Sequence, residues 1–429
     1  MAKFDRFQNQ ISGELPYARG KILANTEDDY RKIAKAHALI RRRIASKESV
    51  FNFTGLERDY PARVDVRDLD DETSAALFEE ELRERGLAHL GGSPSAHDVL
   101  LTNRLTAATF AVHLALVKSN ETVVGISPSY THPTVVRSAR QVGARFVDTV
   151  GFQEFANVVE MEKNISLVVL TRLPVTYDIL DISDVIKTIE LAKSKGLRIY
   201  MDDAGGARVA PVIFGQPKGL ELGADVVATG LDKYGTFGPR FGLLGGKKEM
   251  VSKIRGKAWE FGLEARPIFY SATLNSLRMY DPKRVVALVD TTKQIGVELK
   301  KLLGRYIHET PVTAQILGED LLELILERKH LAIPPIVPFE ATAALAMILL
   351  QDYGIITVHF AGVPPGTSSL LFKFASPETL ANFGGAKRLA EVVSSSIEKL
   401  SELVTNPSEI QRLLFEQPIE SMTKAEYAR

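Results

Sequence analysis

Two stretches of the chain decide its fold: residues 200–208, YMDDAGGAR, and residues 223–235, GADVVATGLDKYG. Each contains a short apolar run typical of a buried β-strand and then polar residues and glycine, which indicates a strand that ends in a turn. Asp202 closes the first run, and Lys233 follows the second. Because ligands collect where the carboxyl ends of parallel strands meet, we expect this acid and this lysine to lie side by side.

An acid and a lysine in this arrangement meet the requirements of pyridoxal phosphate. The cofactor's aldehyde bonds to a primary amine, and its pyridine nitrogen needs a buried carboxylate to stay protonated, so that the ring can accept electrons. We interpret Lys233 as the amine and Asp202 as the ring partner. Asp203 is the better candidate for capping the next helix, and the small Ala204 would let the ring lie flat. Taken alone, a loop lysine is more often a solvated cation.

A phosphate group needs backbone donors at a helix start, and residues 101–109, LTNRLTAAT, lead from a strand-like run at 99–101 into a helix predicted over 107–116. An ordinary threonine-capped helix is the alternative interpretation of this segment. Arg240 is a second candidate for binding the phosphate, and a surface salt bridge is the alternative interpretation of this arginine. The predicted phosphate-binding residues are Asn103, Arg104, Leu105, Thr106 and Arg240.

An aromatic side chain is expected over the face of the pyridine ring. Residues 127–133, SPSYTHP, follow the predicted strand at 122–126, and Tyr130 is our choice for this stacking. His132 is the second choice, and it could instead carry protons or be a plain loop histidine.

Around these motifs, strand-like and helical segments alternate from residue 49 to residue 280. Continuously apolar strands separated by helices predict an α/β domain, with a mostly parallel sheet covered by helices on both faces. The expected strands are 99–101, 121–127, 144–150, 165–171, 197–203, 225–229 and 241–245.

The two ends of the chain differ from this pattern. Residues 1–48 are expected to form a helical segment, since residues 27–47 carry apolar residues at helical spacing beside Arg41, Arg42 and Arg43. A solvated face explains this basic run more often than an RNA contact, and both stay open. From residue 281 to residue 429 we expect a smaller α+β domain, with amphipathic helices at 285–303, 339–350 and 386–403 and strands at 355–360 and 370–374.

Composition sets limits on partners and compartment. The 429 residues are 45% hydrophobic and 25% charged, which is the balance of a soluble protein of roughly two domains. Lys plus Arg and Asp plus Glu both number 53, so no net field attracts nucleic acid or a membrane. Cysteine is absent, which excludes disulfides and thiolate chemistry, and the eight histidines lack a metal-ligand spacing. Without a signal peptide or a membrane span, we expect a cytoplasmic protein.

Together these motifs resemble the fold type I pyridoxal phosphate enzymes of the aspartate aminotransferase superfamily. Within it, the chain most resembles bacterial selenocysteine synthase (seryl-tRNA selenium transferase) and its uncharacterised archaeal relatives. The resemblance implies a seven-stranded, mostly parallel sheet in the large domain. The segments that carry it are 50–55 (VFNFTG), 85–92 (RGLAHLGG), 202–208 (DDAGGAR), 232–240 (DKYGTFGPR), 261–265 (FGLEA) and 353–357 (YGIIT).

The chain departs from the superfamily pattern at three places. Many relatives hold phosphate with a serine three residues before the lysine, where this chain has Gly230, so Thr229 is taken to replace it. Residues 369–374, SLLFKF, lack the arginine that grips a substrate carboxylate in aminotransferases. Residues 171–174, TRLP, lack the asparagine that commonly bonds the ring hydroxyl. These departures weigh against an ordinary amino-acid aminotransferase.

The resemblance implies β-elimination or β-replacement on a serine- or cysteine-like amino acid or an aminoacyl substrate, in a homodimer or larger homo-oligomer. Three alternatives stay open. They are an aminotransferase acting on an unusual amine, a tRNA-binding or acyl-tRNA-modifying protein, and a cofactor-binding protein without turnover. Zero net charge weighs against tRNA, because phosphate contacts dominate RNA affinity.

Overall fold

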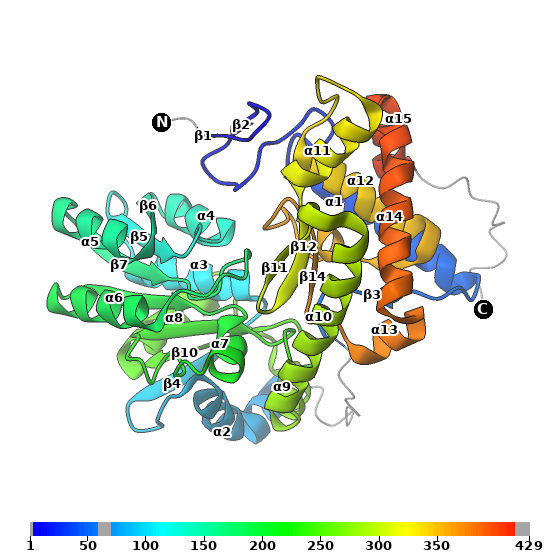
Figure 1. Cartoon of the computed structure of the whole chain (residues 1–429). Helices are drawn as coiled ribbons and strands as arrows, with labels where there is room; N and C mark the ends of the chain where they lie inside the picture. The colour runs from blue at the N-terminus through cyan, green and yellow to red at the C-terminus, as the bar shows by residue number, and fades with distance from the viewer. Residues whose placement is uncertain (1–2, 59–69, 417–429) are drawn as a thin grey trace. The chain divides into compact units, whose positions relative to one another are not determined.

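The computed structural model describes residues 3–58 and 70–416, and the chain divides into two compact units (Figure 1). Residues 56–286 form one, which we call the sheet unit, and residues 1–55 together with 287–429 form the other, which we call the terminal unit. The first residues of the chain therefore belong with its C-terminal part, an association that no sequence motif indicated. The predicted fold class, an α/β large domain with a smaller C-terminal region, is confirmed.

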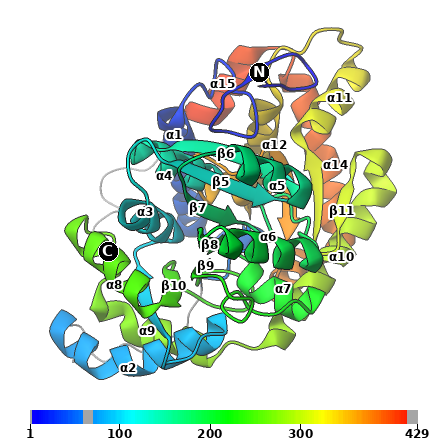
Figure 2. The same ribbon diagram turned by 90° about the vertical axis from the view of Figure 1, so that its left-hand side faces the viewer.

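A seven-stranded sheet forms the centre of the sheet unit. Its strand order is β4-β10-β9-β8-β7-β5-β6, and β10 alone in this sheet runs antiparallel to its neighbours. Figure 2 shows the run from β6 to β10 in this order. The strands are β4 (His97–Thr102), β5 (Thr122–Ser127), β6 (Arg145–Val150), β7 (Ile165–Leu170), β8 (Arg198–Asp202), β9 (Val226–Gly230) and β10 (Gly242–Lys247).

Helices cover both faces of this sheet because its strands are apolar on both sides. Ile199 and Met201 of β8 pack into one core, and Tyr200 between them packs into the other. The first core is closed by α2 (Asp71–Leu90), α5 (Gly151–Met161), α6 (Ile182–Ser194), α7 (Gly206–Phe214) and α9 (Tyr270–Arg278), and the second by α3 (Leu105–Leu116), α4 (Pro133–Gln141) and α8 (Lys248–Glu260).

The strand register aligns the loops that carry the predicted site residues. Gly242, the first residue of β10, pairs with Thr102 at the end of β4 and with Gly230 at the end of β9. Asp202, the last residue of β8, pairs with Ala228 of β9. The carboxyl ends of β4, β8 and β9 therefore lie at one edge of the sheet.

The terminal unit is built around α12 (Pro338–Tyr353), whose residues 338–350 are all buried. We expected an amphipathic helix here, but α12 packs against other elements on every side. Its neighbours include α1 (Thr26–Ala45), α11 (Gly318–Lys329), α14 (Gly385–Leu403) and α15 (Pro407–Phe415). The unit also contains α13 (Pro377–Phe383) and, from Ala287 onward, α10 (Pro282–Leu303).

Apart from the antiparallel pair of β1 (Lys3–Phe4) and β2 (Gln10–Ile11), two small sheets complete the terminal unit. One is antiparallel, with β12 (Thr313–Leu317) between β11 (His308–Thr310) and β14 (Ser369–Lys373). The other joins distant parts of the chain, because β3 (Phe51–Asn52) pairs in parallel with β13 (Ile355–Ile356). The strand expected over 355–360 ends after Ile356, since residues Val358–Phe360 form a 3-10 turn.

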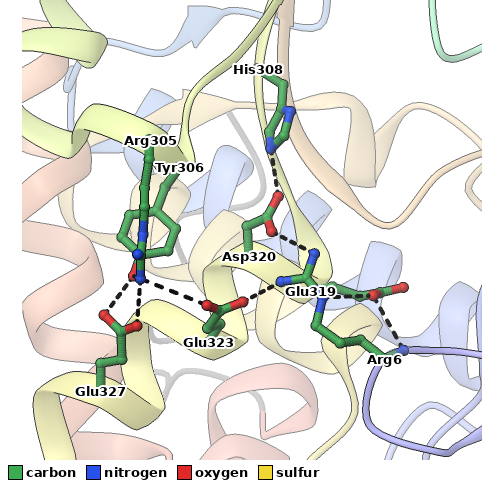
Figure 3. Close-up of polar contacts among 8 residues, drawn as sticks. All are labelled: Arg6, Arg305, Tyr306, His308, Glu319, Asp320, Glu323 and Glu327. Carbon is green, nitrogen blue, oxygen red and sulfur yellow. Dashed lines mark hydrogen bonds and ion pairs between the residues drawn. The ribbon is translucent and has the colours of Figure 1, made fainter.

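Ion pairs attach the start of the chain to α11 (Figure 3). Arg6, between β1 (Lys3–Phe4) and β2 (Gln10–Ile11), lies 2.9 Å from Asp320 and also contacts Glu323. Asp320 in turn lies 2.6 Å from His308 Nε2. An individual exposed ion pair contributes little to stability, so the network as a whole holds the segment between β1 and β2 against α11.

Of the three consecutive arginines of α1, Arg41 to Arg43, one contacts the rest of the terminal unit and two face solvent. Arg43 donates to the carbonyl oxygens of Gln351, at 3.0 Å, and Ser49, at 3.2 Å, whereas Arg41 and Arg42 are exposed. Part of the run therefore has a structural role, and an RNA contact stays a prediction. Among the described residues, no helix is both long enough and apolar enough to cross a bilayer.

Candidate active site

Asp202 and Lys233 lie at the same sheet edge, on neighbouring strands. The side chain of Asp202 is buried, and within the described chain its Oδ1 atom has no hydrogen-bond partner. Lys233 lies in the turn after β9, and a methyl group placed on Gly230 would come within 3.1 Å of its Nζ atom. Glycine at position 230 therefore leaves room for the lysine chain to turn back along the strand end.

The two groups alter each other's proton affinity. Burial raises the pKa of Asp202 to about 6, against the opposing effect of Lys233 and with a further increase from Asp203. Burial also lowers the pKa of Lys233, although Asp232 and Asp202 oppose it. A buried carboxylate that lacks a donor and a nearby amine with weakened proton affinity are typical of catalytic sites.

The turn that carries Lys233 is held from several sides. Thr236 donates its hydroxyl to the Lys233 carbonyl at 2.7 Å, and the Gly235 amide donates to Glu57 at 3.3 Å. The hydroxyls of Tyr234 and Tyr177 lie 2.5 Å apart. A side chain at Gly205 would clash with the Tyr234 ring at 2.3 Å, so glycine is required there. The lysine is thus presented from a fixed loop.

The sequence predicts that Asp203 caps the following helix, but its side chain has a different role. Its carboxylate forms a fully buried ion pair with Arg172, which donates from Nε at 3.2 Å and also from Nη2. The helix α7 begins after Gly205, and no side chain of the described residues caps its start. Arg172 belongs to residues 171–174, TRLP, the segment in which the superfamily's asparagine is missing.

Thr229 and Ala204 join the ends of β9 and β8. Thr229 is fully buried, donates to the Ala204 carbonyl at 3.0 Å and accepts from Arg208 Nη2 at 3.2 Å. Arg208 also donates to His89 Nε2 at 2.9 Å and to the Gly230 carbonyl. With its hydroxyl engaged twice, Thr229 fixes the strand ends and faces no open space, which differs from the phosphate role suggested by the sequence.

The predicted phosphate segment lies at the start of α3. Arg104 is the residue before the helix, the helix starts at Leu105, and no side chain caps it in the described structure. Thr106 is exposed. Asn103 is tied to a neighbouring loop, because its side chain donates to the Gly262 carbonyl at 3.0 Å. The first turn of α3 therefore has backbone amides to which an anion could bind, and the phosphate role of this segment stays a prediction.

Arg240 belongs to a group of arginines around Asp232. The Nε atoms of Arg240 and Arg58 lie 3.4 Å and 3.1 Å from the same carboxylate oxygen, Asp232 Oδ2. Burial, Arg58 and Arg104 together lower the pKa of Arg240 to about 10, with Asp232 opposing them. Two guanidinium groups share one carboxylate, and Arg104 acts on Arg240, so positive charge is in excess here, as a phosphate site requires. Arg58 was not predicted from the sequence, because it follows no recognisable strand end.

Tyr130 and His132 follow β5. Tyr130 is half-buried and close enough to Tyr177 to contribute, after burial and Tyr234, to the raised pKa of that phenol. His132 caps α4, since its Nδ1 accepts from the Thr134 amide at 3.1 Å. His132 therefore has a structural bond, and the ring contact of Tyr130 stays a prediction.

A cavity of about 370 Å³ opens elsewhere on the sheet unit. Its wall combines apolar residues such as Ala207 and Val212 with the polar side chains of His89, Lys218 and Tyr280. Lys233 and Asp202 are not part of this wall. The predicted acid and lysine therefore lie outside this cavity.

Comparisons with known proteins show the family of this chain. A protein from Methanothermobacter thermautotrophicus, described as a UPF0425 pyridoxal phosphate-dependent protein, is 30% identical over 370 residues, which are 86% of this chain and 92% of the relative. The chain belongs to the UPF0425 family. A second UPF0425 protein, from Methanosphaera stadtmanae, is 28% identical over 82% of this chain and 90% of its own length. No family model matches the chain.

Solved structures show the same fold at low sequence identity. Aspartate aminotransferase from Thermotoga maritima aligns with a TM-score of 0.54 and 16% identity over 84% of this chain and 96% of its own. A SepCysS chain, from a complex with the SepCysE N-terminal domain, aligns with a TM-score of 0.55 and 15% identity over 82% and 95% of the two chains. These alignments confirm fold type I, and the UPF0425 relatives confirm the predicted cofactor at the level of the family.

Proposed function

We propose that this UPF0425 protein is a pyridoxal phosphate-dependent enzyme that acts on an amino acid or aminoacyl substrate by β-elimination or β-replacement. The observation that carries the proposal is the unpaired, buried Oδ1 of Asp202 beside Lys233. A protonated pyridine nitrogen would supply the donor that this oxygen lacks in the described chain. The residues present therefore fit the cofactor.

Each part of the site has a role in this proposal. Lys233 provides the amine that bonds to the cofactor, and its lowered pKa leaves more of it neutral and nucleophilic. The amides at the start of α3, Arg240 and Arg58 hold the phosphate. Tyr130 contacts the ring face. Thr229 and Ala204 keep the strand ends together.

The bound cofactor supplies an electron sink that stabilises negative charge at the substrate α-carbon. The chain's own residues would hold a carboxylate, that of Asp202, for the bound ring and would move a proton at Lys233 Nζ. With the cofactor bound, the same proton transfer would serve the loss or exchange of a β-substituent. The missing carboxylate arginine in residues 369–374 weighs against an ordinary amino-acid aminotransferase.

The resemblance to selenocysteine synthase belongs to this proposal, as do a homo-oligomeric state and a cytoplasmic location. The fold shared with SepCysS is compatible with a lyase or transferase. Aminotransferase folds align equally well, so the alignments do not choose the reaction.

The decisive experiment is the absorption spectrum of the purified protein with its cofactor. Lys233→Ala is expected to abolish the visible band of lysine-bonded cofactor, because no other amine is placed opposite Asp202 among the described residues. Lys253→Ala, at an exposed position of α8, is the matched control and should keep the band. Retention of the band in Lys233→Ala would refute the assignment. Release of both pyruvate and ammonia from serine- or cysteine-like substrates would then identify β-elimination, because transamination keeps the β-substituent and releases no ammonia.

A further inference from the structure

A fully buried ion pair lies directly beside the proposed ring partner. Asp203 follows Asp202 at the end of β8, and Arg172 follows the end of β7 on the neighbouring strand. Both side chains are 0% exposed. Arg172 donates to both carboxylate oxygens of Asp203 and, from Nη1, to the Pro217 carbonyl at 2.7 Å. The guanidinium is thus fixed by three bonds.

Consecutive buried carboxylates create an electrostatic problem. Two like charges in a medium of low dielectric constant disfavour each other's ionised form, and Asp203 adds to the raised pKa of Asp202. Replacing a buried ion pair with apolar residues is often neutral or stabilising. Stability alone is therefore a weak reason for Arg172 and Asp203 to be placed here.

The structure shows which charged and titratable groups act on these two acids. Lys233 and Tyr200 interact with Asp202, and Tyr200 and Arg208 interact with Asp203. In the described chain, Arg172 is the cation bonded directly to Asp203. Gln216, which lies 3.5 Å from Arg172 Nη1, is neutral.

We propose that Arg172 is the counter-ion that neutralises Asp203, so that Asp202 remains the one carboxylate free to stay ionised opposite the cofactor ring. Arg172 is then a positioning residue of the site, acting through Asp203. This inference rests on the proposed function and adds an electrostatic role for a residue that stands where the superfamily's asparagine is missing.

The test is the affinity of the cofactor-free protein for pyridoxal phosphate as a function of pH. In the unaltered protein, affinity should fall as pH drops and Asp202 takes up a proton. Arg172→Met leaves Asp203 uncompensated, so the midpoint of this loss should move up by about one pH unit. Asp203→Asn leaves Arg172 unpaired, so the midpoint should move down by about one pH unit. The double variant should return close to the original midpoint.

Opposite shifts are the outcome that separates an electrostatic role from a packing role. If both single variants move the midpoint in the same direction, or leave it unchanged while affinity falls, the counter-ion proposal is wrong. Arg172→Lys keeps the positive charge but loses the bidentate geometry, so the midpoint of the loss of cofactor affinity should stay where it is in the unaltered protein. This variant serves as the comparison with Asp203→Asn if Arg172→Met does not fold.

A further variant separates this inference from the proposed function. In Asp202→Asn, the affinity for pyridoxal phosphate should still depend on pH through the cofactor's own groups. The part of the pH dependence that is due to protonation of Asp202 should be lost. If Asp202→Asn and the unaltered protein show the same pH profile, Asp202 is not the ring partner, and the counter-ion role falls with it. If they differ but the two charge variants do not shift in opposite directions, only the role of Arg172 is refuted.

Discussion

Arg58 shares the Asp232 Oδ2 atom with Arg240, and this pairing predicts a defect specific to phosphate. Arg58→Met removes one guanidinium from the group, and a hydrogen bond between charged partners contributes about 1.5–3 kcal/mol. The dissociation constant for pyridoxal phosphate should therefore rise roughly tenfold to a hundredfold. Affinity for pyridoxal, which has no phosphate, should change little. An equal loss for both compounds would show that Arg58 only supports the loop.

Single residues also show what the sequence could predict about the site. Lys233 and Asp202 could be found because an apolar run marks each strand, and the residue after the run is then at the sheet edge. Arg58 and Arg172 pair with acids far away in the sequence, Asp232 and Asp203, and no local pattern indicates such pairs. Long-range pairing therefore limited the prediction more than chemistry did.

Among the elements, the junction of β4, β10 and α3 depends on Gly242. A methyl group there would lie 2.5 Å from Thr102 Oγ1 and 2.9 Å from both the Arg104 carbonyl oxygen and Leu105 Cα. Gly242→Ala should therefore displace the start of α3, lower the free energy of unfolding by about 1–3 kcal/mol and weaken binding of pyridoxal phosphate. Chemical denaturation and cofactor titration measure the two effects.

Gly256 of α8 is the matched control for this substitution. A methyl group at Gly256 meets nothing within 4 Å, and alanine is favoured over glycine within a helix by about 0.5–1 kcal/mol. Gly256→Ala should thus stabilise the protein and leave cofactor binding unchanged. Similar behaviour of the two variants would contradict the packing argument at Gly242.

Element types were predictable where continuous apolar runs alternate with helical segments. The strands of the large sheet lie within a few residues of their expected positions, because continuous β-branched runs between helices have few other solutions. The segment 355–360 was wrong after Ile356, since apolar residues also line a buried 3-10 turn. For α12 the helix was right but its amphipathic character was not, because burial on all sides depends on tertiary packing.

For the molecule as a whole, stability should depend on pH through Lys32 in the terminal unit. Burial lowers the pKa of this fully buried lysine from 10.5 to about 8, although Asp29 opposes the shift. The unfolded chain therefore binds the proton more tightly, so this contribution to stability rises from pH 8 to pH 10.5. Below pH 8 the folded protein carries the full cost, about 3 kcal/mol.

Lys32→Met should consequently raise the free energy of unfolding at pH 7 by up to about 3 kcal/mol, while Asp29 keeps its ion pair with Arg19 at 2.7 Å. The gain should shrink at pH 9.5. Lys387→Met, on an exposed part of α14, is the control and should change little at either pH. A gain of the same size at both pH values would exclude titration of Lys32 as its cause.

The terminal unit is assembled from both ends of the chain, with β3 paired to β13 and α1 packed on α12 and α15. During synthesis, residues 1–55 leave the ribosome before residues 56–286. They can pack against the rest of their unit only after residues 287 onward have been synthesised. During that interval the apolar side of α1 has nothing to pack against, whereas the sheet unit already has its full sequence. We therefore expect nascent chains of this protein to recruit chaperones to their first helix, and chains that terminate before α12 to be degraded even when the large sheet has formed.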